Sequence, residues 1–306
     1  MTASNPFRDQ PAARPVGPSP GGAPPDGTAP ILDSTAHLMD SISSQLASQL
    51  SLVSLSGRRR PGPPPLVLVA HGSRDPRALR TVRALLRLVG ETRPGVPVHL
   101  GHIELNEPLL PDTLAALDAR GTASAVLVPL LFGHGFHIKR DIPEAAAGAR
   151  LRTAVAAPLG PHPLLVEALY DRLVEAGWPA GMPESERRAS GVVLAAAGSR
   201  DPDSAAGTRR TAQLLADRLG VPVIPAYASA VTPTVRTAAR ALAARGRHRV
   251  AVASCFTAPG RFAAESAASA PWIASAPLGA HPAMARLVLH RYDQALATAA
   301  THRASA

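Results

Sequence analysis

An internal repeat constrains the fold of this 306-residue chain more than any other feature of its sequence. Residues 66–76 read LVLVAHGSRDP and residues 192–202 read VVLAAAGSRDP, so an apolar run followed by Gly-Ser-Arg-Asp-Pro recurs after 126 residues. One letter differs in a chemically decisive way, because His71 of the first copy corresponds to Ala197 of the second. Letters that both copies share describe a shared fold, whereas a histidine held by one copy alone is expected to serve chemistry.

The repeat continues along both copies. The segment PVHLGHIELNEP at 97–108 corresponds to PVIPAYASAVTP at 222–233, and APLGPHP at 157–163 corresponds to APLGAHP at 276–282. The offset between the copies falls to 119 residues, as expected when loops are shortened independently. Two homologous units of about 115 residues are each large enough to bury a core.

The predicted organisation is therefore a leader followed by two domains. Residues 1–65 form a Pro/Gly/Ser-rich leader that we expect to be disordered, apart from a possible amphipathic helix at 34–55. The first domain is predicted over 66–180, and a degenerate second copy over 191–296.

Short apolar runs alternate with helical periods in both units, which predicts an α/β fold. Each unit is expected to form an open parallel sheet with helices on both faces, because buried strands that alternate with helices imply parallel crossovers. In such sheets ligands bind beyond the carboxyl ends of the strands. The strands are predicted near 66–70, 125–129 and 152–156 in the first unit, with another ending near 104, and near 191–196, 222–227, 249–254 and 272–276 in the second.

Composition narrows the classes of partner. The net charge of +10 comes almost wholly from arginine, and the basic residues neither cluster beyond residues 58–60 nor alternate with aromatic residues. Nucleic acid is therefore not an expected partner.

The single cysteine, Cys255, excludes internal disulfides and a cysteine-based metal site, which is typical of a reducing cytoplasm. No segment approaches the roughly 18 apolar residues that a membrane span needs. The composition is compatible with a monomer or an oligomer.

Three side chains of the first unit are predicted to meet at one sheet edge. His71 follows the first strand, Glu104 ends the second, and His137 lies in the segment PLLFGHGFHIKRDIP after the third. Two imidazoles and a carboxylate suit a divalent first-row metal and leave positions open for exchange. All three are replaced together in the second unit, which is expected if they form one site. Their counterparts there are Ala197, Ser229 and Phe262.

Other residues of the same segments carry weaker expectations. Asp141 is interpreted as a helix cap or as a partner of a metal ligand, and His102 and His134 as solvated strand and loop residues. His162 and His281 occur in both copies and are interpreted as structural.

Nucleotide-binding and hydrolase sites are not expected. No P-loop or GxGxxG follows either first strand, so no nucleotide cofactor is predicted, and Ser73 lacks the GxSxG context of a hydrolase nucleophile.

The first unit resembles the sirohydrochlorin chelatases, which are class II, ATP-independent tetrapyrrole chelatases. The resemblance rests on AHGSRDP, on Glu104 followed four residues later by Pro108, and on the run at 129–143. It is strong over residues 66–180 and persists in degenerate form over 191–295. By this resemblance His71 and His137 match the family's metal-binding histidines, and Glu104 matches the acid beside them.

The resemblance implies insertion of Fe²⁺ or Co²⁺ into a polycarboxylate tetrapyrrole, for sirohaem or cobalamin synthesis. The divalent metal would be a substrate, with no resident cofactor. Arg74 and Arg140 lie next to the predicted site in the sequence and are expected to bind carboxylates of the tetrapyrrole. The ligand set suits iron, cobalt and nickel alike. A non-catalytic metal carrier that uses the same two histidines, and a scaffold with a vestigial site, are the alternative interpretations.

Overall fold

The computed structural model describes residues 62–304, which belong to one compact unit, Gly62–Ala306. The predicted helix at 34–55 and nearly all of the predicted leader lie outside the described residues. Within the described part of the chain, no helix has both the length and the apolar character needed to cross a membrane.

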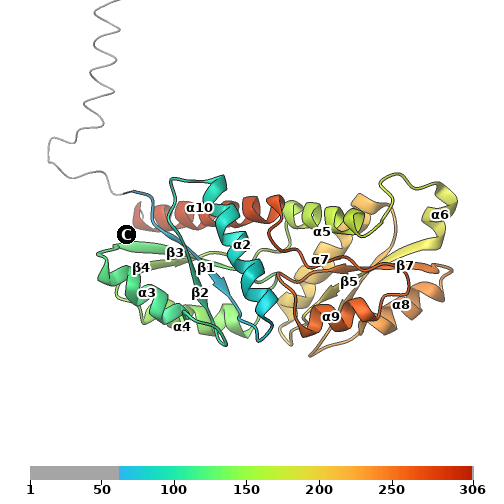
Figure 1. The fold of residues 1–306 in the computed structure, drawn as a ribbon, viewed down its shortest axis with the longest axis horizontal. Helices are drawn as coiled ribbons and strands as arrows, with labels where there is room; N and C mark the ends of the chain where they lie inside the picture. Colours follow the sequence, from blue (N-terminus) through green and yellow to red (C-terminus); the bar gives the residue numbers. More distant parts are fainter. Residues whose placement is uncertain (1–61, 305–306) are drawn as a thin grey trace, which may run out of the picture. The chain divides into compact units, whose positions relative to one another are not determined.

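The first half contains a four-stranded parallel sheet in the order β2-β1-β3-β4 (Figure 1). Its central strand β1 is fully buried because it consists of five apolar residues with neighbours on both sides. The elements of this half are β1 (Leu66–Ala70), α2 (Pro76–Thr92), β2 (Val98–His102), α3 (Leu110–Ala119), β3 (Ser124–Pro129), the π-helix η1 (His137–Asp141), α4 (Ile142–Ala147), β4 (Arg152–Val155) and α5 (Pro163–Glu175).

The second half contains a three-stranded parallel sheet in the order β6-β5-β7. The α/β class and the two parallel sheets confirm the predicted fold class. The elements of this half are α6 (Glu184–Ala189), β5 (Ser190–Ala196), α7 (Pro202–Leu219), β6 (Val223–Tyr227), α8 (Val235–Ala243), β7 (Arg249–Ser254), α9 (Arg261–Ala268) and α10 (Pro282–Ala304).

The strand predicted near 272–276 is reduced to an isolated bridge between Val252 and Ala274. Two backbone hydrogen bonds form this bridge, from the N–H of Val252 to the carbonyl of Ile273 and from the N–H of Ser275 to the carbonyl of Val252, each at 2.9 Å. The ladder stops there, because the N–H of Ser254 donates to the hydroxyl of Ser275 instead, at 2.9 Å. Pro271 and Pro277 bracket the segment and lack the N–H groups that would extend it. The prediction of a full fourth strand was therefore wrong.

The last helices of the two repeats are exchanged between the sheets. Helix α10 packs on α2, β3 and β4 of the first half, whereas α5 packs on α7 and β7 of the second, and the two helices also contact each other. Figure 1 shows α10, in red, over the first sheet and α5, in yellow-green, over the second. One apolar core consequently contains residues of both sheets and both exchanged helices, while separate cores under α3/α4 and under α8 serve single sheets.

The two histidines that the repeats share cap these exchanged helices. The Nδ1 atom of His162 accepts a hydrogen bond from the N–H of Leu164 at 3.1 Å, and Nδ1 of His281 accepts from Ala283 at 3.2 Å. The geometry fits the structural interpretation of both residues, since each satisfies a backbone donor at a helix start.

Candidate active site

His71 and Glu104 are brought together by the backbone that follows β1 and β2. The N–H of Glu104 donates to the carbonyl of His71 at 3.0 Å. Gly72 makes this approach possible, because it has a φ of +104° and a Cβ there would lie 1.8 Å from the carbonyl oxygen of Glu104. The second half repeats the arrangement, with Gly198 at φ +91° against the carbonyl of Ser229. The shared glycine therefore serves the fold, as the repeat predicted.

The side chains of His71 and Glu104 lie side by side at the carboxyl end of the first sheet. Nδ1 of His71 is 3.6 Å from Oε1 of Glu104, which is an ion-pair distance rather than a direct hydrogen bond. The carboxylate is about half exposed to solvent, at 52% of the side chain. Asn106 ties the two loops together, since its Oδ1 accepts a hydrogen bond from the N–H of Ser73 at 2.7 Å. Asn106 was not predicted from the sequence, although its replacement by Val231 in the second copy marks it as specific to the first.

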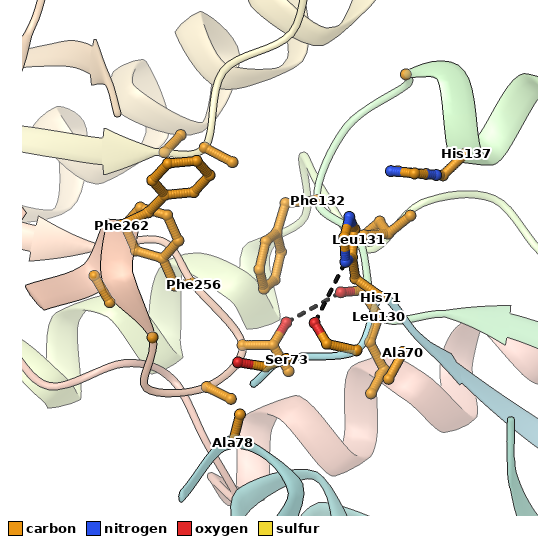
Figure 2. Close-up of a pocket in the computed structure, with 18 of the residues that line it drawn as sticks. Ala70, His71, Ser73, Ala78, Leu130, Leu131, Phe132, His137, Phe256 and Phe262 are labelled. Carbon is orange, nitrogen blue, oxygen red and sulfur yellow. Dashed lines mark hydrogen bonds between the residues drawn. The ribbon is translucent and has the colours of Figure 1, made fainter. Parts of the chain in front are cut away.

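His137 begins the π-helix η1 and faces His71 across the loop that follows β3. The centroids of the two imidazole rings are 4.6 Å apart and the rings are nearly perpendicular, at 88°. Figure 2 shows the two rings together on one side of the pocket. The structure thus brings together His71, Glu104 and His137, as the sequence predicted.

Asp141 orients the ring of His137. Its Oδ2 lies 2.5 Å from Nδ1 of His137, a contact in which Nδ1 donates to the carboxylate and Nε2 is left as the ring's free acceptor. The contact fits the interpretation of Asp141 as a partner of a metal ligand, and Asp141 makes no side-chain hydrogen bond that caps α4.

The side chains gathered here do not form a closed metal site. Within residues 62–301, no group of three or more His, Cys, Asp or Glu side chains is arranged to hold a metal ion. Two imidazoles leave coordination positions open, in contrast to a closed structural site. Cys255 also lines the pocket, but burial raises the pKa of its thiol to about 12, so it does not supply a thiolate.

The two imidazoles open into a pocket of about 1310 Å³ that is lined by both halves of the molecule. Four of the five phenylalanines of the chain line it, although aromatic residues make up only 3% of the sequence. Phe256 and Phe262 lie opposite the histidines in Figure 2, and Phe132 lies between them and His71 in this view. Phe132 and Phe256 were not predicted from the sequence, because single aromatic residues in loops carry no periodic signal.

The two predicted carboxylate-binding arginines differ in their surroundings. Arg74 is exposed and lines the pocket. Arg140 is not among the lining residues, and its Nε donates to Oε1 of Glu144 at 2.9 Å. Arg261 of the second half lines the pocket and was not predicted.

Two other histidines line the pocket, His102 and His134. His102 is 1% exposed, so the expectation of a solvated residue was wrong. Its Nδ1 is 3.2 Å from the carbonyl of Pro108, and burial lowers its pKa. His134 is exposed, as expected.

Comparison with known proteins gives a consistent result. The model of the CbiX family matches residues 65–176 and 191–295 of this chain. The sirohydrochlorin cobaltochelatase of Methanococcus aeolicus is 38% identical over 79 residues, which are 26% of this chain and 55% of that protein. The sirohydrochlorin ferrochelatase of Bacillus subtilis is 32% identical over 178 residues, which are 56% of this chain and 65% of that protein. The matches thus span just over half and just under two thirds of these two relatives.

A solved structure shares the fold over both halves. SirB from Bacillus subtilis with Fe³⁺ superimposes with a TM-score of 0.62 at 24% sequence identity, over 77% of this chain and 96% of that chain.

Proposed function

Because this chain belongs to the CbiX family of sirohydrochlorin chelatases, which are class II chelatases, we propose that it inserts a divalent metal ion into sirohydrochlorin. One observation carries the proposal: two imidazoles 4.6 Å apart open into a pocket of about 1310 Å³ with phenyl rings on its opposite side. Such a pocket accommodates a flat conjugated macrocycle, and the imidazoles can present a metal ion to one of its faces.

In the proposed reaction the metal ion is a substrate that His71 and His137 hold through their neutral rings. Metal insertion replaces two pyrrole protons by two bonds to nitrogen, so both protons must leave the macrocycle. Glu104 accepts the two pyrrole protons one after the other as general base and passes each to solvent, which its half-exposed carboxylate contacts. Asp141 keeps the ring of His137 in the tautomer that binds metal.

The ligand set does not select among iron, cobalt and nickel, since imidazole binds all three. We propose Fe²⁺ or Co²⁺ as the physiological metal, with sirohaem or a cobalt precursor of cobalamin as the product. The relatives named above include both a cobaltochelatase and a ferrochelatase.

A non-catalytic metal carrier is the second candidate, and the site geometry disfavours it. A carrier needs a closed ligand set and no large cavity, whereas this site combines two imidazoles with a pocket lined by both halves.

The test is anaerobic incubation of the protein with sirohydrochlorin and Fe²⁺, Co²⁺ or Ni²⁺, followed by the absorbance change of metallation. The wild type should accelerate insertion of at least one ion. His71→Ala and His137→Ala should each reduce the rate at least 100-fold, because each removes a metal ligand. Glu104→Gln should lower the maximal rate more than the metal affinity. The matched control is His248→Ala, an exposed histidine that does not line the pocket. Tight metal binding without any acceleration would favour the carrier.

A further inference from the structure

The two repeats place different chemistry at one equivalent position of the pocket. In the first half the loop after β3 leads to Phe136 and His137 at the start of η1. In the second half the loop after β7 leads to Arg261 and Phe262 at the start of α9. The proposed metal ligand His137 thus corresponds to the phenyl ring of Phe262. The exposed ring of Phe136 corresponds to the guanidinium of Arg261.

Phe262 contributes to an apolar wall that faces the metal-binding side of the pocket. Figure 2 shows its ring next to Phe256, across the pocket from His71 and His137. Phe256 and Phe262 are both half-buried, so part of each ring remains accessible from the pocket. Phenyl rings favour offset or edge-on contact with other π systems, which gives this wall a preference for a flat conjugated ligand.

Arg261 is loosely held beside that wall. Its side chain is 76% exposed, its Nε is 3.9 Å from Oε1 of Glu265, and its guanidinium carbon is 4.9 Å from the centre of the Phe262 ring. An exposed pair at this distance contributes little, so a carboxylate of a ligand can replace Glu265 at small cost. Histidines aside, Arg74 and Arg261 are the cationic side chains among the described residues that line the pocket.

The acidic residues of the pocket do not cancel this charge. Asp75 is paired with Arg77 at 2.7 Å, which leaves Glu104 as the other carboxylate of the lining. Glu104 lies on the histidine side, beside His71. A polycarboxylate ligand therefore meets positive charge on the side of Arg261, which is offset there by the exposed Glu265 at 3.9 Å.

From this arrangement we infer that Arg261 and Phe262 form the macrocycle-binding site of the second half. Phe262 stacks against the tetrapyrrole, and Arg261 pairs with one of its peripheral carboxylates. The second copy has thus exchanged metal binding for recognition of the organic substrate. This inference rests on the proposed function and assigns its substrate specificity to two named residues.

The test is a titration of the full-length protein with metal-free sirohydrochlorin at low and high salt, followed by absorbance. Phe262→Leu keeps apolar bulk but removes the ring, so it should weaken binding about threefold to tenfold at both salt concentrations. Arg261→Ala should weaken binding about fivefold to tenfold at low salt and much less at high salt, because salt screens an exposed ion pair. The matched control is Arg245→Ala, which removes an exposed arginine that does not line the pocket.

A second measurement separates this inference from the proposed function. Co²⁺ binding without tetrapyrrole should be unchanged in both variants, and far-UV circular dichroism should show an intact fold. If the wild type binds sirohydrochlorin and both variants bind it equally well at low salt, the role of Arg261 and Phe262 is refuted while the proposed function stands. If the wild type itself does not bind sirohydrochlorin, the proposed function fails, and the inference fails with it.

Discussion

Gly72 and Gly198 occupy equivalent positions in the two repeats, where a neighbouring carbonyl leaves no room for a side chain. Each has a positive φ, and a Cβ at either position would lie 1.8 Å or 2.1 Å from a carbonyl oxygen of the neighbouring loop. Only the loop beside Gly72 carries a residue of the proposed metal site, namely Glu104. The two glycines are therefore equivalent for the fold and different for chemistry.

This pair gives a prediction with an internal control. Gly72→Ala and Gly198→Ala should each lower the free energy of unfolding by about 2 kcal/mol or more, because both force a strained backbone to move. Gly72→Ala alone should also slow metallation well beyond tenfold, since it displaces Glu104 from His71. The measurements are urea unfolding and the metallation rate, with Gly95→Ala as the control because nothing lies within 4 Å of a Cβ there. Equal loss of activity in both variants would contradict the assignment of chemistry to the first half.

The sequence was informative at this scale wherever the two copies could be compared. Loss of three polar residues from one copy predicted that His71, Glu104 and His137 would lie together. Arg261 was not predicted, because the prediction rested only on polar residues that the second copy has lost. A charged residue that the second copy has gained, as at Arg261, is equally informative. Arg140 is adjacent to Asp141 in the sequence, but neighbouring residues of a helix point in different directions. Its guanidinium therefore lies against Glu144 and not in the pocket.

At the scale of elements, the exchange of α5 and α10 could not be predicted. Leu165, Leu169 and Leu173 follow a helical period and are fully buried. Such a period shows that a helix has an apolar face, but it does not say which of two similar sheets that face covers. The sheets themselves were predictable, because buried strands leave a local signal.

The histidine caps of the exchanged helices predict sensitivity to acid. Burial is the main cause that lowers the pKa of both His162 and His281 below the ordinary value of 6.5. As the pH falls below about 6.5, the unfolded chain takes up protons that the folded chain refuses, so stability present above this pH is lost. His281→Asn keeps a cap acceptor that does not titrate. It should therefore flatten the fall in the free energy of unfolding between about pH 6.5 and 5. Urea unfolding at several pH values measures this, and an unchanged slope would contradict it.

At the scale of the whole molecule, the shared core couples the two halves. Residues of β1 and β5 belong to one apolar cluster together with both exchanged helices. Neither sheet can lose its cover without disturbing the other. The described part of the chain should therefore unfold as one cooperative unit.

A substitution at Leu287 of α10 tests this coupling. Helix α10 covers the first sheet, whereas tryptophan fluorescence reports the unfolding of the second half. Trp178 follows α5 and its ring is 5.7 Å from that of Trp272 in the second half. Leu287 is fully buried, so Leu287→Ala should cost about 2–5 kcal/mol. The unfolding midpoint should shift equally by tryptophan fluorescence and by circular dichroism, and Val155→Ala, at a position 37% exposed, is the mild control. A fluorescence midpoint that stays unchanged would show that the halves unfold separately.

The exchange of α5 and α10 explains how the two copies could remain together in one chain while their pocket residues diverged. In a symmetric pair of identical chains, every substitution appears on both walls of a central pocket, so a histidine cannot become a phenylalanine on one side only. Here both copies lie in one chain, and each needs the other's last helix to complete its core. Neither copy can be discarded, yet each is free to mutate alone. Mutual structural dependence thus preserves a second copy whose pocket residues are under separate selection.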